Sequence, residues 1–176
     1  IVAYQTAWLK AHYPVEFLSA MCTNDMGDTS KLGVLIGEAK GLGVNVLPPD
    51  INESRINFSP AQDGTVIRYG LAAIKGVGEA AVEAILTARG TEKPFKSLAE
   101  LCDRVELRAM NRKVLEALIK AGACDSFGMT RASLTAQIER TLARASSTAA
   151  DRTRGQETLF GMLEAGNSKS DEIPAA

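Results

Sequence analysis

A glycine-rich turn with an adjacent lysine, residues 75–78 (Lys-Gly-Val-Gly), has the residue types best suited to chemistry in this chain. Its two glycines can adopt positive φ angles and bring bare backbone close to a ligand. An apolar run, residues 71–74, precedes the turn, and apolar residues at helical spacing follow from Glu79. A helix that begins at this point directs unpaired N–H groups outward, where they favour phosphate oxygens. The stretch therefore predicts a phosphate-binding turn to which Lys75 adds positive charge.

This pattern resembles a helix-hairpin-helix, a module that contacts the backbone of nucleic acids and carries no base readout. Val77 is expected to fill the gap between the two helices. We predict contact with the DNA backbone for the turn and the start of the following helix: Lys75, Gly76, Val77, Gly78, Glu79 and Ala80. An ordinary tight turn between two core helices is the alternative. Glu79 and Glu83 favour that alternative, because carboxylates on this helix oppose phosphate.

A basic cluster follows on the C-terminal side. Ser97 and Glu100 form a capping pattern for a helix that runs to about Arg104. Asn111 is expected to cap the next helix, residues 112–121, which Gly122 ends. These two helices predict a second, degenerate helix pair, and basic side chains lie in and around their connector: Arg104, Arg108, Arg112 and Lys113. We predict DNA contact for the last three, with a solvated basic face as the alternative.

A short segment near the C-terminus, residues 155–161 (Gly-Gln-Glu-Thr-Leu-Phe-Gly), has the form of a peptide anchor. Leu159 and Phe160 can fill an apolar pocket of a partner while the amide of Gln156 fixes the register at its rim. Exposing these two apolar side chains in a polar stretch has no folding benefit, which favours a partner. Docking of the segment on its own domain is the alternative.

The composition excludes several classes of protein. The 176 residues, 45% of them hydrophobic, allow one large or two small domains, and the net charge of −1 excludes a globally basic nucleic-acid-binding protein. The three cysteines, Cys22, Cys102 and Cys124, lack metal-ligand spacing, so we expect buried thiols in a reducing cytoplasm. The single histidine, His12, is expected to be structural. We find no transmembrane run or signal peptide and predict no membrane partner.

The fold predicted from these patterns is mainly α with a small antiparallel β-sheet and a tandem helix-hairpin-helix. Helices are expected over residues 2–12 and 15–22 and from Asp28 or Thr29 to Gly41. Strands are expected over residues 44–47, 56–58 and 66–69, with a turn at Asp63-Gly64. We expect this sheet to brace the hairpin that follows it.

The C-terminal part is expected to end in a helix and a tail. Gly90 is predicted to end the helix after the hairpin, and Thr130 to cap a last helix over residues 131–145. From Ser146 the sequence loses its periodicity and is typical of a linker or disordered tail. The predicted divisions are helices (1–43), sheet segment (44–70), tandem helix-hairpin-helix (71–145) and tail (146–176).

Several longer stretches resemble bacterial DNA polymerase III alpha subunits. They are Tyr-Gln-Thr-Ala-Trp-Leu-Lys-Ala-His-Tyr-Pro (4–14), Val-Leu-Pro-Pro-Asp-Ile-Asn (46–52), Ile-Arg-Tyr-Gly-Leu (67–71), Ile-Lys-Gly-Val-Gly (74–78) and Leu-Ile-Lys-Ala-Gly-Ala-Cys-Asp (118–125). The resemblance covers about residues 1–163 and implies the end of the fingers domain, the tandem helix-hairpin-helix and the region after it. The first residues lie within a helical pattern that has no cap and no initiator Met, as in a segment of a longer chain.

The resemblance also implies partners and a cofactor. In this family a short Gln-x-x-hydrophobic-Phe segment after the hairpins binds the β sliding clamp, and Gln156, Glu157, Thr158, Leu159 and Phe160 fit that pattern. The complete pattern favours the replicative member of the family over its error-prone paralogue. The family carries out template-directed DNA synthesis with Mg²⁺ held by palm-domain aspartates. We assign no catalytic residue and no metal ligand to this segment, and the other holoenzyme subunits are expected to contact the rest of the longer chain.

Two functions are compatible with the sequence. The first is a segment that holds duplex DNA by its backbone and tethers a polymerase to the clamp. The second is a structural hub with little DNA affinity of its own, whose hairpin packs against protein. Salt dependence separates them, because only phosphate contact gives an affinity that falls steeply with salt.

Overall fold

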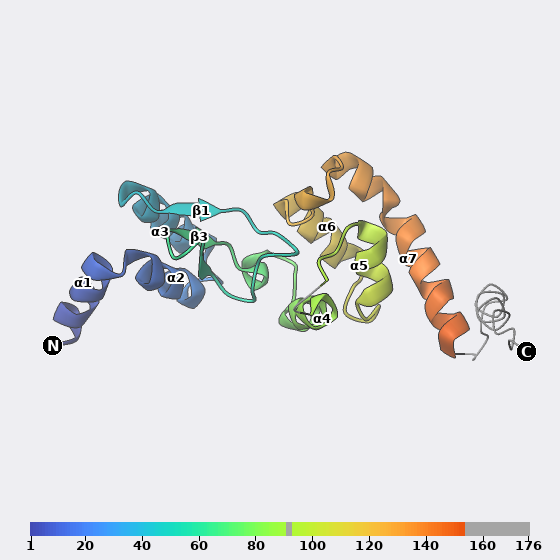
Figure 1. Cartoon of the computed structure of the whole chain (residues 1–176), viewed down its shortest axis with the longest axis horizontal. Helices are drawn as coiled ribbons and strands as arrows, with labels where there is room; N and C mark the ends of the chain where they lie inside the picture. The colour runs from blue at the N-terminus through green and yellow to red at the C-terminus, as the bar shows by residue number, and fades with distance from the viewer. Residues whose placement is uncertain (91–92, 154–176) are drawn as a thin grey trace, which may run out of the picture.

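The computed structural model describes residues 1–90 and 93–153, which form two lobes arranged end to end (Figure 1). The first lobe holds α1 (Val2–His12), α2 (Pro14–Asn24), α3 (Thr29–Gly41) and the strands β1 (Asn45–Leu47), β2 (Ser59–Ala61) and β3 (Val66–Arg68). The second holds the 3₁₀ turn η1 (Leu71–Ala73), α4 (Glu79–Arg89), α5 (Leu98–Arg104), α6 (Arg112–Ala121), the 3₁₀ turn η2 (Asp125–Phe127) and α7 (Arg131–Thr153). The mainly helical fold with a small sheet is therefore confirmed. No described helix is both long and apolar enough to cross a membrane.

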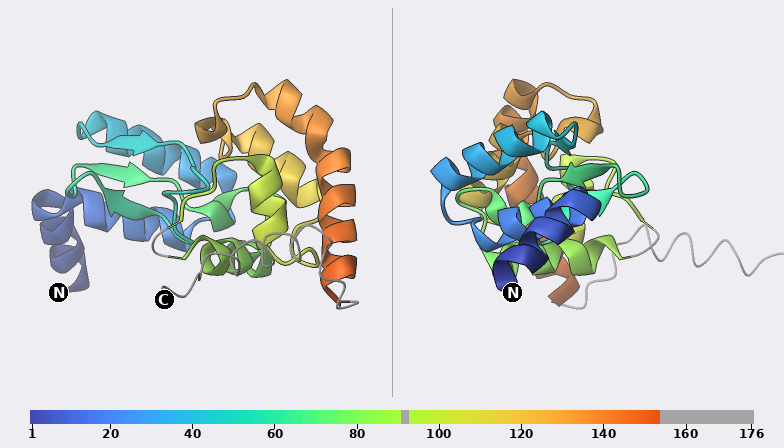
Figure 2. Two further views of the ribbon diagram at one scale, coloured as in Figure 1. Left: turned by 45° about the vertical axis from the view of Figure 1, so that its right-hand side comes forward. Right: turned by 90° about the vertical axis from the view of Figure 1, so that its left-hand side faces the viewer.

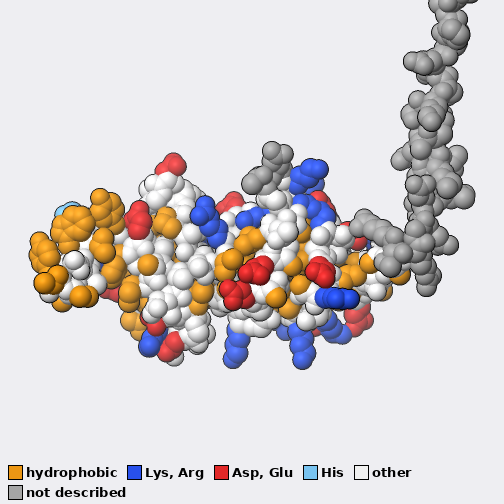
Figure 3. Space-filling view, turned by 90° about the horizontal axis from the view of Figure 1, so that it is seen from below, with side chains coloured by type: hydrophobic (Ala, Val, Ile, Leu, Met, Phe, Trp, Pro, Cys, Tyr) orange, Lys and Arg blue, Asp and Glu red, His pale blue; other side chains and the backbone are white. Residues whose placement is uncertain are grey.

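The first lobe is built on α2 and α3. The carboxylate of Asp28 accepts hydrogen bonds from the backbone N–H groups of Ser30 and Lys31, so α3 begins where the sequence predicts. Leu18, Cys22, Leu32 and other apolar side chains of these helices share one core with Val44, Phe58 and Ile67. By contrast, α1 buries none of its side chains, and its apolar residues gather at one end of the molecule (Figure 3).

The sheet is mixed, which corrects the antiparallel sheet expected from the sequence. Its strand order is β1-β3-β2, with β2 antiparallel to β3 but β1 parallel to it. The hairpin between β2 and β3 turns at residues 62–64, which all have positive φ, as the Asp63-Gly64 signal predicts. After β1, Pro48-Pro49 prevents a tight hairpin. The long connection from β1 to β3 allows these two strands to pair in parallel.

The strand expected over residues 56–58 is wrong, and β2 lies three residues later. The backbone of the segment before β2 is used elsewhere: the carbonyls of Arg55 and Ile56 accept hydrogen bonds from the N–H groups of Leu71 and Ala72. These bonds hold η1 against the first lobe. The expected bracing of the hairpin is therefore supplied by residues 55–58 rather than by a strand.

Two polar side chains join the lobes. The side chain of Asn52 donates to the carbonyl of Phe95 (2.9 Å) and accepts from its N–H group (2.7 Å). Arg89, at the end of α4, donates to the carbonyls of Ile51 (3.3 Å), Asn52 (2.8 Å) and Ser54 (2.9 Å). Burial lowers the pKa of Arg89, and the nearby carboxylate of Asp50 acts in the opposite direction. Charge-assisted bonds of this kind are among the stronger hydrogen bonds in proteins.

The second lobe packs α4 to α7 around one core. Its largest fully buried side chains include Ile85, Leu101, Leu115, Leu118 and Leu134. Several predicted helix ends are confirmed: Ser97 accepts from the N–H of Glu100, Asn111 accepts from that of Val114, Thr130 accepts from that of Ser133, and Gly90 and Gly122 end their helices with positive φ. The second predicted helix pair, α5 and α6, is thereby formed.

α7 is longer than the helix over residues 131–145 that the sequence predicts. The helix continues eight residues beyond Ala145, to Thr153. Ala145 is buried and Thr148 and Ala149 are half-buried, so the spacing of the inward-facing positions continues past Ser146 with small side chains. Alanine is also the best helix former. The sequence does not reveal this helical periodicity because no large apolar residue occupies the inward-facing positions after Leu142.

The three cysteines are all buried and free, as expected. Burial raises the pKa of the Cys102 thiol to about 11 and that of the Cys124 thiol to about 12. Because the thiolate is the reactive form, these groups are chemically inert in the folded chain. The described residues contain no group of three or more side chains able to hold a metal ion.

Acid is expected to weaken the connection between α6 and α7. The guanidinium of Arg131 donates to both carboxylate oxygens of Asp125 (3.0 and 2.6 Å), which lowers the pKa of Asp125 below its ordinary value of about 3.9. A carboxyl whose pKa is lower in the folded state stabilises the fold above its unfolded pKa and loses that contribution as the pH falls through the folded pKa. We expect Asp125→Asn to lower the free energy of unfolding at pH 7 by about 0.2–1 kcal/mol, the range for exposed pairs.

Urea unfolding at pH 7 and pH 2.5 tests this. The Asn variant is expected to lose less stability between the two pH values than the wild-type chain does. Equal losses in both proteins would show that Asp125 makes no contribution to the acid transition.

Candidate nucleic-acid interface

The hairpin between η1 and α4 has the geometry of a close-approach turn. Gly76 has a φ of +93°, a conformation that favours glycine, whereas Gly78 has a φ of −77°. The expectation of positive φ is therefore confirmed at Gly76 and wrong at Gly78, whose extended backbone begins α4. Val77 is buried in the core, as expected for the residue that fills the gap.

The first arm of the hairpin is a single 3₁₀ turn and not the end of an α-helix. The N–H groups of Leu71 and Ala72 donate to the carbonyls of Arg55 and Ile56. They therefore do not bond to carbonyls of a preceding helical turn. This corrects the expectation of an apolar helix before the turn. The hairpin is held from both sides, by residues 55–58 before it and by Val77 beneath it.

The start of α4 offers unused hydrogen-bond donors. The N-cap of α4 is Gly78, which has no side chain to cap the helix, while α3, α5 and α6 each have a side-chain cap. The backbone N–H groups of Gly76, Gly78, Glu79 and Ala80 make no hydrogen bond within the described part of the chain. All four residues are exposed. Donors at a helix N-terminus attract anions through both hydrogen bonding and the helix dipole.

Two lysines flank these donors. A Cβ atom placed on Gly76 would lie 3.5 Å from the Cβ of Ala117, so the hairpin lies against α6. Lys113 is one helical turn before Ala117 and shares its face of α6. Lys75 and Lys113 are both exposed, and neither forms an ion pair among the described residues. The structure thus brings together two parts of the predicted site that are far apart in the sequence.

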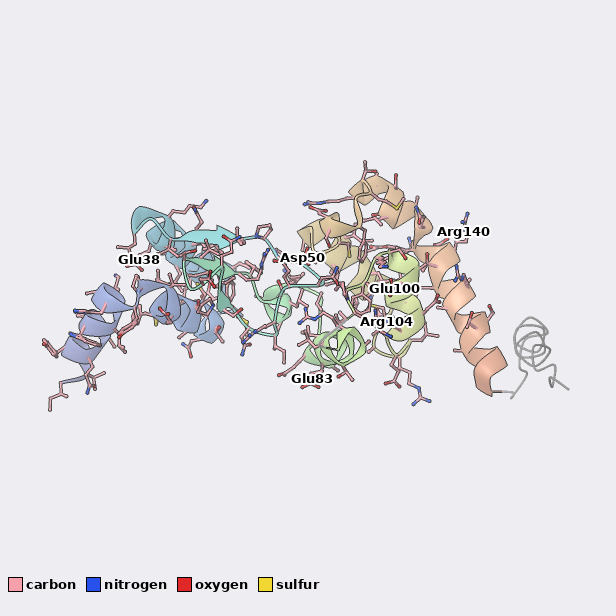
Figure 4. All side chains as sticks on the ribbon, viewed as in Figure 1. Glu38, Asp50, Glu83, Glu100, Arg104 and Arg140 are labelled. Carbon is pink, nitrogen blue, oxygen red and sulfur yellow. The ribbon has the colours of Figure 1, made fainter. Side chains whose placement is uncertain are left out.

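Some side chains of the basic cluster form ion pairs with carboxylates of the described residues, and others do not. Arg104 lies between α4 and α5 (Figure 4), where it pairs with Glu100 (3.0 Å), donates to the carbonyls of Arg89 and Lys93 and stacks on the ring of Phe95 (4.5 Å). Its role is structural.

Arg112 is also engaged, by Glu116 (2.8 Å) and by Glu139 of α7, and the hydrogen bond to Glu116 is the main reason that its pKa is raised. Arg108 and Lys113 form no ion pair within the described residues. Of the three predicted contacts in this cluster, these two side chains are therefore available to a phosphate. Sequence reasoning could have found the Arg112–Glu116 pair from its i,i+4 spacing, but not the contact with Glu139.

Acidic side chains lie beside the hairpin as well. Glu79 and Glu83 are exposed on α4, and Glu83 and Glu106 line a hollow of about 390 Å³ together with Arg104. Side chains of both signs are interspersed over the second lobe in Figure 3. The face of the second lobe seen in Figure 3 is therefore not a continuous basic surface.

The predicted clamp-binding residues, Gln156 to Phe160, lie outside the described residues. Their role stays a prediction, as do the four domain divisions.

Comparison with known proteins agrees with this geometry. A family model described as "Helix-hairpin-helix motif" matches residues 43–134, from before β1 to the beginning of α7. The chain belongs to the helix-hairpin-helix family. The match includes residues 55–58, which brace the first hairpin. The family model therefore covers the bracing segment as well as the helices.

This chain is also similar to part of several longer proteins. It is 44% identical over 163 residues to "DNA polymerase III subunit alpha" of Vibrio cholerae and, at the same identity and length, to that of Escherichia coli K12. It is 46% identical over 164 residues to that of Neisseria meningitidis serogroup A. Each match covers 93% of this chain but 14% of the relative. The resemblance inferred from the sequence is confirmed, and the chain corresponds to a segment of such proteins.

Proposed function

We propose that this chain is a segment of a bacterial DNA polymerase III alpha subunit, in which it holds duplex DNA by the backbone through its first hairpin. The unpaired N–H groups at the start of α4, beside Lys75 and Lys113, are the observation that carries the proposal. Their geometry suits the non-bridging oxygens of one phosphate group. Contacts of this kind give no sequence preference, which suits an enzyme that copies any template.

The substitution Gly78→Glu tests the proposal. The backbone at Gly78 has an ordinary negative φ, and a Cβ there meets nothing within 4 Å, so glutamate introduces no strain. Its carboxylate would stand where a phosphate is expected. We expect the affinity for duplex DNA, measured by fluorescence anisotropy at low salt, to fall about tenfold or more, because charge-assisted hydrogen bonds contribute about 1.5–3 kcal/mol. The wild-type affinity should fall steeply as salt is added.

Gly37→Glu is the matched control. It makes the same change of charge in α3 of the other lobe, also in open space. If Gly37→Glu weakens DNA binding as much as Gly78→Glu does, general charge repulsion and not the hairpin accounts for the loss. A folded wild-type chain that does not bind DNA at low salt would contradict the proposal for this segment.

The remaining functions belong to the proposed whole protein. It would carry out template-directed DNA synthesis in the cytoplasm as part of the holoenzyme, with Mg²⁺ for nucleotidyl transfer. Gln156, Glu157, Thr158, Leu159 and Phe160 would bind the β sliding clamp. Two linked weak contacts, one to DNA and one to the clamp, give a large effective concentration, so each can be weak alone.

A structural hub is the second candidate, and specific observations favour it. Glu79 and Glu83 lie on the helix that would face phosphate, and α1 leaves large apolar side chains exposed, including Val2 (73% exposed) and Tyr4 (73%). A hub of this kind would brace neighbouring domains and would have no affinity for DNA. The salt titration described above separates the two functions.

A further inference from the structure

A groove of about 700 Å³ lies between α5, the loop that follows it and the C-terminal half of α7. Val105 and Leu107 line one side, Ala145 and Thr148 line the side of α7, and Arg108 stands among the lining residues. Its volume is in the range of pockets that hold a small ligand or a pair of large side chains.

The groove results from a change of residue size along α7. The inward-facing positions of the first half of α7 carry Leu134, Ile138 and Leu142, which pack against the core of the second lobe. The inward-facing positions of the second half carry Ala145 and Thr148. Since α7 continues as one unbroken helix past Ala145 (Figure 2), the smaller side chains leave space beneath them. The salt bridge between Arg144 and Asp103 (3.2 Å) holds α7 to α5 at this level.

The chain itself carries the side chains that would fill this space. No Val, Ile, Leu, Met or Phe occurs from residue 143 to residue 158, and Leu159 and Phe160 are the first large apolar residues after Leu142. Thr148 lies five residues before the end of α7, about 8 Å at 1.5 Å per residue. Leu159 follows Thr153 by six residues, which can span about 20 Å. The segment is therefore long enough to return to the groove, and Gly155 allows the chain to reverse.

The charged residues that line the groove are Asp103, Arg104, Glu106 and Arg108, and Arg104 and Asp103 are already engaged in ion pairs. Arg108 is exposed beside the groove and forms no ion pair among the residues described. Glu157 precedes Leu159 by two residues, so its carboxylate would lie near the rim when Leu159 enters the groove.

We propose that the segment 156–160 occupies the groove between α5 and α7 when no clamp is bound, so that the groove and the clamp compete for Leu159 and Phe160. The competition rests on the proposed function of this segment. In this state the groove would cover Leu159 and Phe160, and a clamp would have to displace the segment in order to bind it. If the segment is docked nine-tenths of the time, the apparent affinity for the clamp is reduced about tenfold.

Docking in the groove is tested without any clamp. Methyl NMR spectra are compared between the 176-residue chain and its Leu159→Ala/Phe160→Ala variant. The methyl signals of Val105, Leu107 and Ala145 are expected to shift, because they lose contact with an aromatic ring. Those of Leu18, in the other lobe, should remain unchanged and serve as the control. Unchanged signals for all three groove residues overturn the proposal.

The competition is tested with a filled groove. Thr148→Phe places a ring in the groove, and Ser147→Phe is the matched control, because Ser147 is the exposed neighbour and both hydroxyls donate to the carbonyl of Arg144. We expect Thr148→Phe to bind the purified clamp about tenfold more tightly than the wild-type chain and as tightly as the free peptide 154–163. Ser147→Phe should match the wild-type chain. Equal affinities for the peptide, the wild-type chain and Thr148→Phe overturn the competition. A free peptide that does not bind the clamp overturns the proposed function instead, while the NMR comparison still decides whether the groove is occupied.

Discussion

Replacing Gly70 with alanine is expected to lower the free energy of unfolding by about 1–3 kcal/mol or more, the range for overpacking a well-packed site. A Cβ atom at this position would lie 2.6 Å from the carbonyl carbon of Asn57, 2.7 Å from the carbonyl oxygen of Ile56 and 2.8 Å from the nitrogen of Phe58. All three are backbone atoms, so no side chain can rotate away and the chain itself must move. The φ of Gly70 is −76°, which any residue can adopt, so the close approach is the reason for glycine here.

The effect of this substitution should reach the hairpin. The backbone segment that Gly70 touches is the one whose carbonyls accept the N–H groups of Leu71 and Ala72 and so hold η1 in place. Pushing that segment away would weaken these two hydrogen bonds together. We therefore expect Gly70→Ala to reduce DNA affinity as well, although the residue lies outside the predicted contact set.

Urea unfolding of Gly70→Ala and Gly33→Ala measures the difference. Gly33 lies within α3 with nothing within 4 Å of a Cβ, so alanine should be neutral or stabilising there by about 0.4–1 kcal/mol. If both variants have the stability of the wild-type chain, the close contact at Gly70 is easily relieved and the argument for glycine at this position is wrong.

The helix ends were predictable because their signals are local. Asp28, Ser97 and Asn111 each cap a helix with their own side chain within three residues, so sequence alone contains the whole interaction. One detail differs at Ser97: Glu100 accepts a hydrogen bond from the N–H of Lys96 rather than from that of Ser97. That bond is the main reason that the pKa of Glu100 is lowered.

The sheet was not predictable in the same way. The alternation of Ile56, Asn57 and Phe58 is typical of a strand. The carbonyls of Arg55 and Ile56, however, accept hydrogen bonds from residues about sixteen positions further on, and β2 forms later at Ser59–Ala61. The parallel pairing of β1 with β3 depends on the course of the long connection between them. Both facts follow from tertiary contacts that no local pattern contains, which is why strand pairing is harder to infer than a helix cap.

The candidate site was predictable in position but not in detail. The pattern of residues 75–78 identifies the turn, and the structure adds which side chains around it remain free. Lys113 lies near the hairpin because α6 lies against Gly76, through a contact with Ala117, which is more than forty positions away in the sequence. Arg112, which the sequence places in the same basic cluster, is neutralised by Glu116 and Glu139. Local spacing thus predicts which residues are basic and near the turn, but not which of them are available.

The proposed clamp contact carries the largest effect that we expect from a binding-site substitution. Leu159→Ala/Phe160→Ala removes both apolar anchors of the predicted motif and should reduce clamp affinity at least a hundredfold, since truncating a central anchor of an interface costs about 2 kcal/mol or more. DNA affinity should stay within twofold of the wild-type value, because the hairpin is untouched. Surface plasmon resonance with immobilised clamp measures the first quantity, and anisotropy of labelled duplex measures the second.

Met162→Ala/Leu163→Ala is the control, because it removes a similar apolar mass just outside the motif. It should leave clamp affinity nearly unchanged if the motif from Gln156 to Phe160 is the anchor. Gln156→Ala alone should weaken binding less than the double variant, because in the proposed contact the amide would only fix the register at the rim while the two apolar side chains would fill the pocket. Undiminished clamp binding by Leu159→Ala/Phe160→Ala would show that the contact lies elsewhere in the chain, and the tail would then lose its assigned function.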